Sequence, residues 1–258
     1  MEALTRVSVA DLKAARIWSS FDHLVDGFSI RFGAWAQRIL TKEARQAGEG
    51  FVAGGEAGAL AMIQTGPWLA FLTKLWITVT TAGGQFTAED LEPAEEIPDS
   101  VYENAARDWL DGNAKPHAIG ITSTTHETTQ QSIRNARDTG ITGSQGIAAM
   151  LTADLKRQAP GRAKRIANTE VHGSANMGSY TAAKEVDAVG YKIWIATPDN
   201  RTRDQHRAAH NQRVRLTEPF IVGGERLMYP GHTSMGASLW NLVNCRCSQR
   251  FVMQRRAR

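Results

Sequence analysis

The longest regular pattern in the chain is a stripe of apolar residues near its N-terminus. Its members recur every three or four residues: Ile17, Phe21, Leu24, Phe28, Phe32, Trp35 and Ile39. That spacing places all of them on one side of an α-helix. Ser8, followed three residues later by Asp11, is a suitable start for such a helix. The pattern predicts a helix over about 8–47, whose stripe packs either in the protein's own core or against another chain.

Glycines and prolines divide the sequence that follows. Five glycines between 48 and 58 predict a flexible connector, and the Gly-Pro pair at 66–67 predicts the start of a helix that ends near 81. The acidic, proline-containing segment 86–100 has the composition of a linker. Further helices are predicted over 100–110, from the threonine-rich stretch 122–129 to 138, over 147–158, and from 160 to about 190.

The last third of the chain changes from helical to strand-like patterns. Residues 191–197 alternate aromatic and β-branched side chains, as a half-buried strand does, and a Pro-Asp-Asn turn follows. A short polar helix, two short β segments and a final strand are expected after it. We therefore predict an α+β protein with a mainly helical N-terminal two-thirds and a small β-containing C-terminal module. The predicted division is a helical region 1–85, an acidic linker 86–100 and a domain 101–258.

Length and composition exclude several classes of protein. A chain of 258 residues with only two cysteines can build a core without disulfides, which fits synthesis in a reducing cytosol. The sequence shows no secretory signal, and its longest apolar run, 67–80, contains Lys74 and is too short for a bilayer span of about 20 residues. No P-loop, dinucleotide fingerprint, zinc-protease motif or nucleophile elbow is present.

The charge is distributed unevenly along the chain. Residues 201–258 contain eleven arginines and no lysine against three acidic residues, whereas 86–111 contain nine acidic residues and one arginine. An arginine-rich end favours phosphate contacts, and the candidates for nucleic-acid contact are Arg246, Arg250, Arg255, Arg256 and Arg258. The alternative is that the acidic and basic regions neutralise each other, within one subunit or between neighbours.

The two cysteines are one residue apart, at Cys245 and Cys247. In a strand they would point to the same face with Cα atoms roughly 6–7 Å apart, at the upper limit for a disulfide. Two such thiols can instead bind zinc, with histidines completing the ligand set. His206, His210 and His232 are the candidates for this role. The alternative is that the cysteines are two small buried hydrophobic residues.

Glu170 lies in a polar run of the helix that precedes the first strand. A partly buried carboxylate needs a cation or hydrogen-bond donors, so Arg201 or Arg203 is its expected partner. A structural ion pair and a catalytic Glu-His-Arg group are both consistent with these residues.

The order of four short motifs resembles a known family. The motifs are Asp-x-Arg-Thr-Arg-x-x-His at 199–206, Pro-Phe-x-Val at 219–222, Tyr-Pro-Gly at 229–231 and Asn-Cys-Arg-Cys at 244–247. In this order they are similar to the C-terminal domain of phage minor head proteins typified by protein F of phage Mu. The resemblance extends over roughly 159–251 and implies structural roles for Glu170, Arg201, Arg203, His206 and Asn244.

This chain departs from the family pattern at two places. Arg203 stands where some members have a cysteine, which removes one candidate zinc ligand. His210-Asn211 replaces the usual Asp-Gly after the short helix, and asparagine can adopt the left-handed conformation that such a turn needs.

The resemblance implies a minor capsid, or head morphogenesis, protein of a tailed phage or prophage. Such a protein would be made in the bacterial host cytoplasm and built into the virion. Its expected partners are the portal protein, other head proteins and packaged double-stranded DNA inside the head, without a membrane. The family implies no enzymatic activity and no cofactor beyond the candidate zinc. The alternative is a metal-dependent hydrolase or nuclease built on Glu170, the histidines and the two cysteines.

Overall fold

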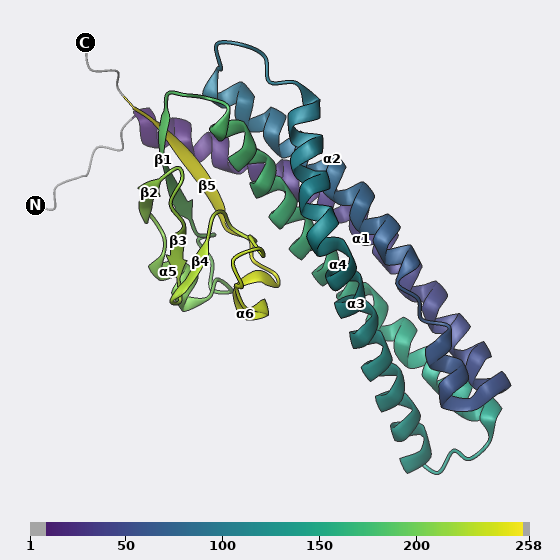
Figure 1. The fold of residues 1–258 in the computed structure, drawn as a ribbon. Coiled ribbons are helices and arrows are strands. Elements are labelled where there is room, and N and C mark those ends of the chain that lie inside the picture. Colours follow the sequence, from purple (N-terminus) through teal and green to yellow (C-terminus); the bar gives the residue numbers. More distant parts are fainter. Residues whose placement is uncertain (1–8, 255–258) are drawn as a thin grey trace, which may run out of the picture. The chain divides into compact units, whose positions relative to one another are not determined.

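The computed structural model describes residues 9–254, and their side chains from Ser20 onward. Four long helices come first (Figure 1): α1 (Val9–Ala61), α2 (Gly66–Leu91), α3 (Asp99–Asp138) and α4 (Ser144–Lys184). Five short strands and two short helices follow them. The predicted α+β class, with long N-terminal helices and a small C-terminal β module, is confirmed. The predicted helix start at Ser8 lies outside the described residues, as do the side chains of Asp11 and Ile17.

The glycines between 48 and 58 do not form a flexible connector, so that prediction is wrong. The helix α1 continues to Gly54 and Gly55, which have non-helical backbone angles, and resumes until Ala61. Gly55 has a φ of 62°, a conformation that glycine adopts without steric cost. Gly50 and Gly58 then face each other so closely that a Cβ on either would overlap the other's carbonyl oxygen. The glycines allow a bend and a close backbone contact.

Other predicted helix breaks are also absent. The helix α2 extends past 81 into the acidic segment, and α3 and α4 each run through a region that was predicted to separate two helices. In α3 the hydroxyls of Thr122, Thr125 and Thr128 donate to carbonyl oxygens of the preceding turn, so these side chains do not compete with the helix. Pro116 and Pro160 lie inside α3 and α4. Each proline removes one main-chain hydrogen bond, and the remaining interactions of a long helix compensate for that loss.

Contacts divide the chain into two compact units, and each long helix contributes to both. One unit consists of the described parts of residues 1–28, 78–105 and 169–258, and it contains all the strands. The other consists of residues 29–77 and 106–168 and is entirely helical. The predicted division at 86–100 into independent domains stays a prediction.

The helical unit has an apolar core that includes the middle of the N-terminal stripe. Phe32 packs edge-on against Phe71 of α2 with ring centroids 5.9 Å apart, and the indoles of Trp76 and Trp109 stack 3.4 Å apart. Ile39 is also buried. This part of the stripe therefore packs in its own chain, and a contact of the N-terminal helix with another chain stays a prediction.

One carboxylate is buried in the helical unit. The Oε1 atom of Glu43 accepts a hydrogen bond of 2.8 Å from Trp68 Nε1, while its Oε2 atom has no hydrogen-bond partner among the described residues. Burial raises the pKa of Glu43 to about 7, although the bond from Trp68 and the charge of Arg162 act in the opposite direction. The folded state therefore favours the protonated form.

Glu43→Gln is expected to stabilise the protein at pH 8 and to have little effect near pH 4. When folding raises the pKa of an acid, the protein loses stability as the pH rises. The loss occurs between the pKa of Glu43 in the unfolded chain, 4.5, and its pKa in the folded protein, about 7. A shift of this size corresponds to about 3 kcal/mol at most. Urea unfolding of both proteins between pH 4 and pH 8 measures the effect. A difference between the two proteins that did not change with pH would contradict a neutral, buried Glu43.

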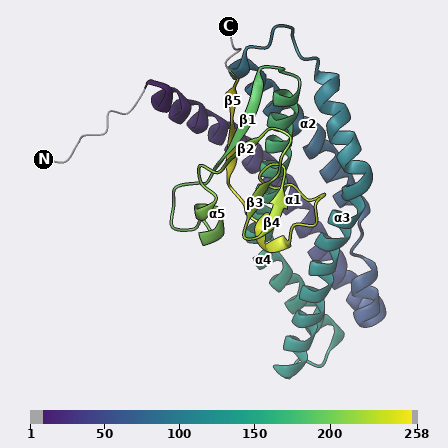
Figure 2. The ribbon, with the colours of Figure 1, turned by 60° about the vertical axis from the view of Figure 1, so that its left-hand side comes forward.

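The other unit carries a three-stranded antiparallel sheet in the order β2 (Arg213–Arg215), β1 (Val189–Ile195), β5 (Ser248–Met253). Strands β1 and β5 lie side by side although they come from opposite ends of the module (Figure 1). A separate hairpin pairs β3 (Phe220–Val222) with β4 (Glu225–Leu227) through Gly223 and Gly224, both with positive φ (Figure 2). Such a two-glycine turn matches the twist of a hairpin.

Within residues 9–254, no helix is both long enough and apolar enough to span a membrane.

Candidate metal centre

Two separate segments of the C-terminal module bring His206, Cys245 and Cys247 together. His206 lies on the short helix α5 (Asp204–Ala208), and the two cysteines lie between α6 (Leu239–Leu242) and β5. The turn before the cysteines is formed by Asn244, whose φ of 57° is left-handed and whose main-chain N–H donates to Thr169 Oγ1. Asn211 has a φ of 65° after α5, which confirms that asparagine serves in that turn.

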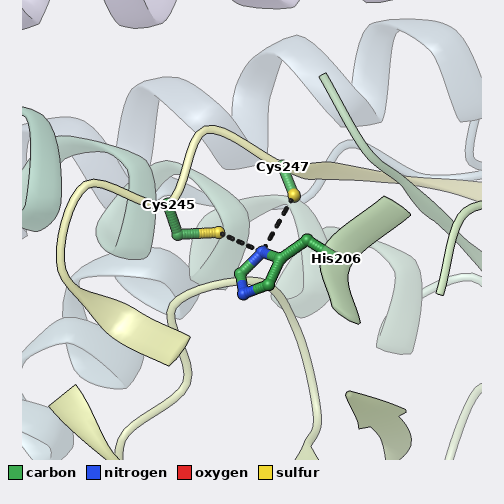
Figure 3. Close-up of side chains that lie close together, drawn as sticks. All are labelled: His206, Cys245 and Cys247. Carbon is green, nitrogen blue, oxygen red and sulfur yellow. Dashed lines mark hydrogen bonds between the residues drawn. The ribbon is translucent and has the colours of Figure 1, made fainter. Parts of the chain in front are cut away.

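The imidazole of His206 faces both sulfur atoms (Figure 3). Its Nδ1 atom lies 3.3 Å from Cys247 Sγ and 3.6 Å from Cys245 Sγ. The three residues are 1%, 2% and 3% exposed for His206, Cys247 and Cys245, so solvent does not reach them. Both cysteines are free, as predicted. We call these three residues the His-Cys cluster.

Asn241 determines the tautomer of the His206 ring, that is, which of its two nitrogens carries the proton. Its Nδ2 group donates to Val222 O and to Glu225 Oε2, so its Oδ1 atom is left to accept a bond from His206 Nε2, 3.1 Å away. The Nε2 atom therefore carries a proton. In a neutral imidazole the lone pair of Nδ1 then points at the two sulfurs. A histidine held in this way is oriented as metal-binding histidines are.

The geometry of the His-Cys cluster fits a zinc ion. Zinc bonds of about 2.3 Å to sulfur and about 2.0 Å to nitrogen, in tetrahedral geometry, place the nitrogen and sulfur ligands about 3.5 Å apart. The observed separations of 3.3 and 3.6 Å are close to that value, and all three ligand atoms lie within 4.8 Å of one another. Zinc would be held by His206, Cys245 and Cys247 and would crosslink α5 to the start of β5. Three protein ligands leave one coordination position for another ligand.

The two thiols are not equivalent. The hydrogen bond from Cys247 lowers the pKa of the Cys245 thiol well below its usual value; burial opposes this effect, and His206 adds to it. The same contact, together with burial, raises the pKa of Cys247. Within this hydrogen-bonded group, the thiol of Cys245 is the more acidic of the two.

Arg246 holds the cysteine segment in place. Its guanidinium makes a bidentate contact with Asp199, at 2.6 and 2.8 Å, which is the strongest common geometry for such a pair. This contact lowers the pKa of Asp199 well below its usual range. Thr197 Oγ1 donates to the carbonyl oxygen of Arg246. The turn after β1 therefore holds both the main chain and the guanidinium of Arg246. Arg246 was predicted to contact nucleic acid, but its guanidinium is already occupied by Asp199.

The other two candidate histidines lie away from the cluster. His210 is on the turn after α5, because that helix ends at Ala208, and its Nδ1 atom accepts a bond from the main chain of Ala196. His232 packs its ring against Tyr229, and its Nδ1 atom accepts a bond from the main chain of Met228. Among the described residues, neither joins the ligand group.

The predicted arginine and glutamate positions are distributed over the module. Arg201 contacts Asp199, and Arg203 donates to Val243 O and lies over the ring of Trp240. Glu170 is buried in α4, and its pairing with Arg201 or Arg203 stays a prediction. Arg250 is exposed on β5. The last three candidates, Arg255, Arg256 and Arg258, lie outside the described residues.

Sequence reasoning missed two residues that support the cluster. Asp199 is the first residue of the Asp-x-Arg-Thr-Arg motif, and a structural role could have been predicted from that position. Asn241 had no local signal, since it lies 35 positions from His206 and meets it only in the folded module.

Fold and site together describe an α+β protein whose C-terminal module is centred on a buried histidine-cysteine cluster. Residues 127–250 match the family described as Phage Mu protein F like protein, which confirms the predicted resemblance over that segment. The matched segment contains the whole His-Cys cluster with Asp199 and Asn241. Comparisons with curated proteins and with solved structures gave no match. The family match supports a role in phage head morphogenesis.

The geometry does not favour the hydrolase alternative. A hydrolytic metal must be reached by substrate and water, whereas all three residues of the cluster are at most 3% exposed. Glu170, the carboxylate of the predicted catalytic group, is not part of the ligand group. The arrangement suits a crosslink inside the module.

Proposed function

We propose that this protein is a minor capsid protein of a tailed phage or prophage, built into the head in few copies beside the portal. The single observation that carries the proposal is the match of residues 127–250 to the Phage Mu protein F like family. The buried His-Cys cluster supports it, because a cluster closed to substrate stabilises a fold instead of performing chemistry. The low copy number and the position at the portal follow from the family's expected role.

The proposal includes a contact with packaged double-stranded DNA inside the head. The arginine-rich composition of the last 58 residues supports it, because arginine binds phosphates in a bidentate, salt-dependent way. The proposal leaves Arg246 out of this contact, because its guanidinium is paired with Asp199. The arginines at 255, 256 and 258 stay assigned to it.

Incorporation into particles tests the proposal. Procapsids and mature virions are purified from the source, and quantitative mass spectrometry compares this chain with the portal and major capsid proteins. The expected result is that both particles contain the chain, in far fewer copies than the major capsid protein. Crosslinking is expected to join it to the portal protein, and in DNA-filled heads also to DNA.

The possible outcomes separate the parts of the proposal. Absence of the chain from both kinds of particle would exclude a capsid role. Presence without crosslinks to the portal protein would exclude only the position at the portal. As a control, the exposed His210 is changed to Ala, which should leave incorporation unchanged because this side chain is neither part of the His-Cys cluster nor one of the arginines assigned to DNA.

A further inference from the structure

One face of the three-stranded sheet is rich in arginine. In the register of the sheet, Ile193 of β1 stands opposite Arg213 of β2 and Arg250 of β5, and Tyr191 stands opposite Arg215. Opposite residues, and residues two apart on one strand, point to the same side of a sheet. Arg213, Arg215, Arg250 and Tyr191 therefore share one side, which we call the arginine face. The alternate positions of β1, Lys192 and Trp194, are fully buried on the other side.

No ion pair within the described chain joins the arginine face to an acidic side chain. All three arginines are exposed, and none of them is in a described ion pair. The guanidinium of Arg213 lies over the ring of Tyr191, 4.1 Å from its centroid, which holds it flat on the sheet. Glu218 lies beside the face, where its carboxylate accepts a weak bond from the main chain of Arg215. Three guanidinium groups thus remain available to a binding partner.

A complementary surface lies at the junction of α2 and α3. Glu89, Glu92, Glu95 and Glu96 are all exposed there, and we call these four residues the acidic junction. None of them takes part in a described ion pair, and the loop contains Pro93 and Pro98, each of which restricts its own backbone φ. The acidic junction belongs to the same compact unit as the arginine face. No ion pair among the described residues joins the two surfaces.

We propose that the arginine face of one copy binds the acidic junction of a second copy. Each molecule carries both surfaces, they are opposite in charge, and the fold does not pair them. Contact between two copies satisfies both surfaces, whereas a DNA backbone would satisfy the arginine face and leave the acidic junction unpaired. This inference goes beyond the proposed function, because it requires neither portal nor DNA.

The contact joins two different surfaces, so it is heterologous and head-to-tail. Such contacts generate rings when the rotation between copies closes, and open chains when it does not. Each exposed charge pair contributes only about 0.2–1 kcal/mol and is screened by salt. We therefore expect weak, salt-sensitive association of the free protein, which becomes strong where several copies are held side by side and their effective concentration is high.

Two charge-reversal variants test the proposal. The first carries Arg213→Glu, Arg215→Glu and Arg250→Glu, and the second carries Glu92→Lys, Glu95→Lys and Glu96→Lys. By sedimentation velocity at low ionic strength, wild type is expected to associate and each variant alone to be monomeric. A mixture of the two is expected to form a complex, because the first retains the acidic junction and the second retains the arginine face. Added salt should dissociate both the wild-type and the mixed complexes.

A control separates this contact from a general effect of net charge. Arg31→Glu, Lys74→Glu and Lys115→Glu change the charge by the same amount as the first variant, at exposed positions outside both surfaces, and should leave association in place. If the first variant does not fold, as judged by circular dichroism, Arg213→Gln, Arg215→Gln and Arg250→Gln replace it. Monomeric wild type at low salt would overturn the proposal, and so would a mixture that fails to associate. Loss of DNA binding in the first variant without any self-association would show that DNA occupies the arginine face instead.

Discussion

Purified protein is expected to contain close to one zinc ion per chain. Cys245→Ser and Cys247→Ser should each remove it and destabilise the C-terminal module by on the order of 3–5 kcal/mol, because metal binding to such a site is coupled to folding. The reason is geometric. His206 and both cysteines are buried within ligand distance of one another, and Asn241 orients the imidazole toward the sulfurs. Elemental analysis and thermal unfolding with and without a chelator measure the effect.

The controls for this prediction are the two histidines that lie away from the His-Cys cluster. His210→Ala and His232→Ala should both keep the zinc, since neither side chain reaches the ligand group. The result that would contradict the prediction is a zinc content near zero with a C-terminal module that unfolds normally. In that case each cysteine substitution should cost only about 1 kcal/mol, as expected for a small buried side chain.

The helices show which parts of a fold a sequence can specify. The stripe from Phe21 to Ile39 predicted a helix because its spacing is a local property, and the structure buries several of its members. The ends of the helices were predicted poorly because they depend on contacts distant in sequence. The glycines at 50 and 58 read as flexible, but they are required by the close approach of two helical segments. The intervals 110–122 and 158–160 were predicted to separate helices, but α3 and α4 run through them with Pro116 and Pro160 inside.

The metal centre shows the same distinction. Cys245, Cys247 and His206 could be grouped from their spacing and from the order of the motifs. His210 was grouped with His206 on the assumption of a longer helix, and the end of α5 at Ala208 separates them. The pairing of Asp199 with Arg246 spans 47 positions and could not be inferred from spacing, because it depends on how two loops meet in the folded module.

Gly178→Ala is expected to destabilise the protein by on the order of 2–3 kcal/mol. Gly178 of α4 lies directly against α2, where an added Cβ would overlap the carbonyl oxygen of Thr80 and lie 2.8 Å from the main-chain nitrogen of Gly84. These contacts are backbone atoms, which cannot move aside without shifting a helix. Overpacking of this kind typically costs about 1–3 kcal/mol. Urea unfolding, with circular dichroism as the probe, measures the change.

Gly27→Ala is the matched control, because Gly27 lies in α1 and a methyl group added there would have no heavy atom within 4 Å. Alanine is the better helix former by roughly 1 kcal/mol, so this variant should be slightly more stable than wild type. Gly83→Ala should behave like Gly178→Ala, since its Cβ would lie 2.5 Å from the carbonyl oxygen of Ala175 across the same contact. If Gly178→Ala were as stable as Gly27→Ala, α2 and α4 would not be in backbone contact. The four small residues at 83, 84, 175 and 178 would then have no packing role.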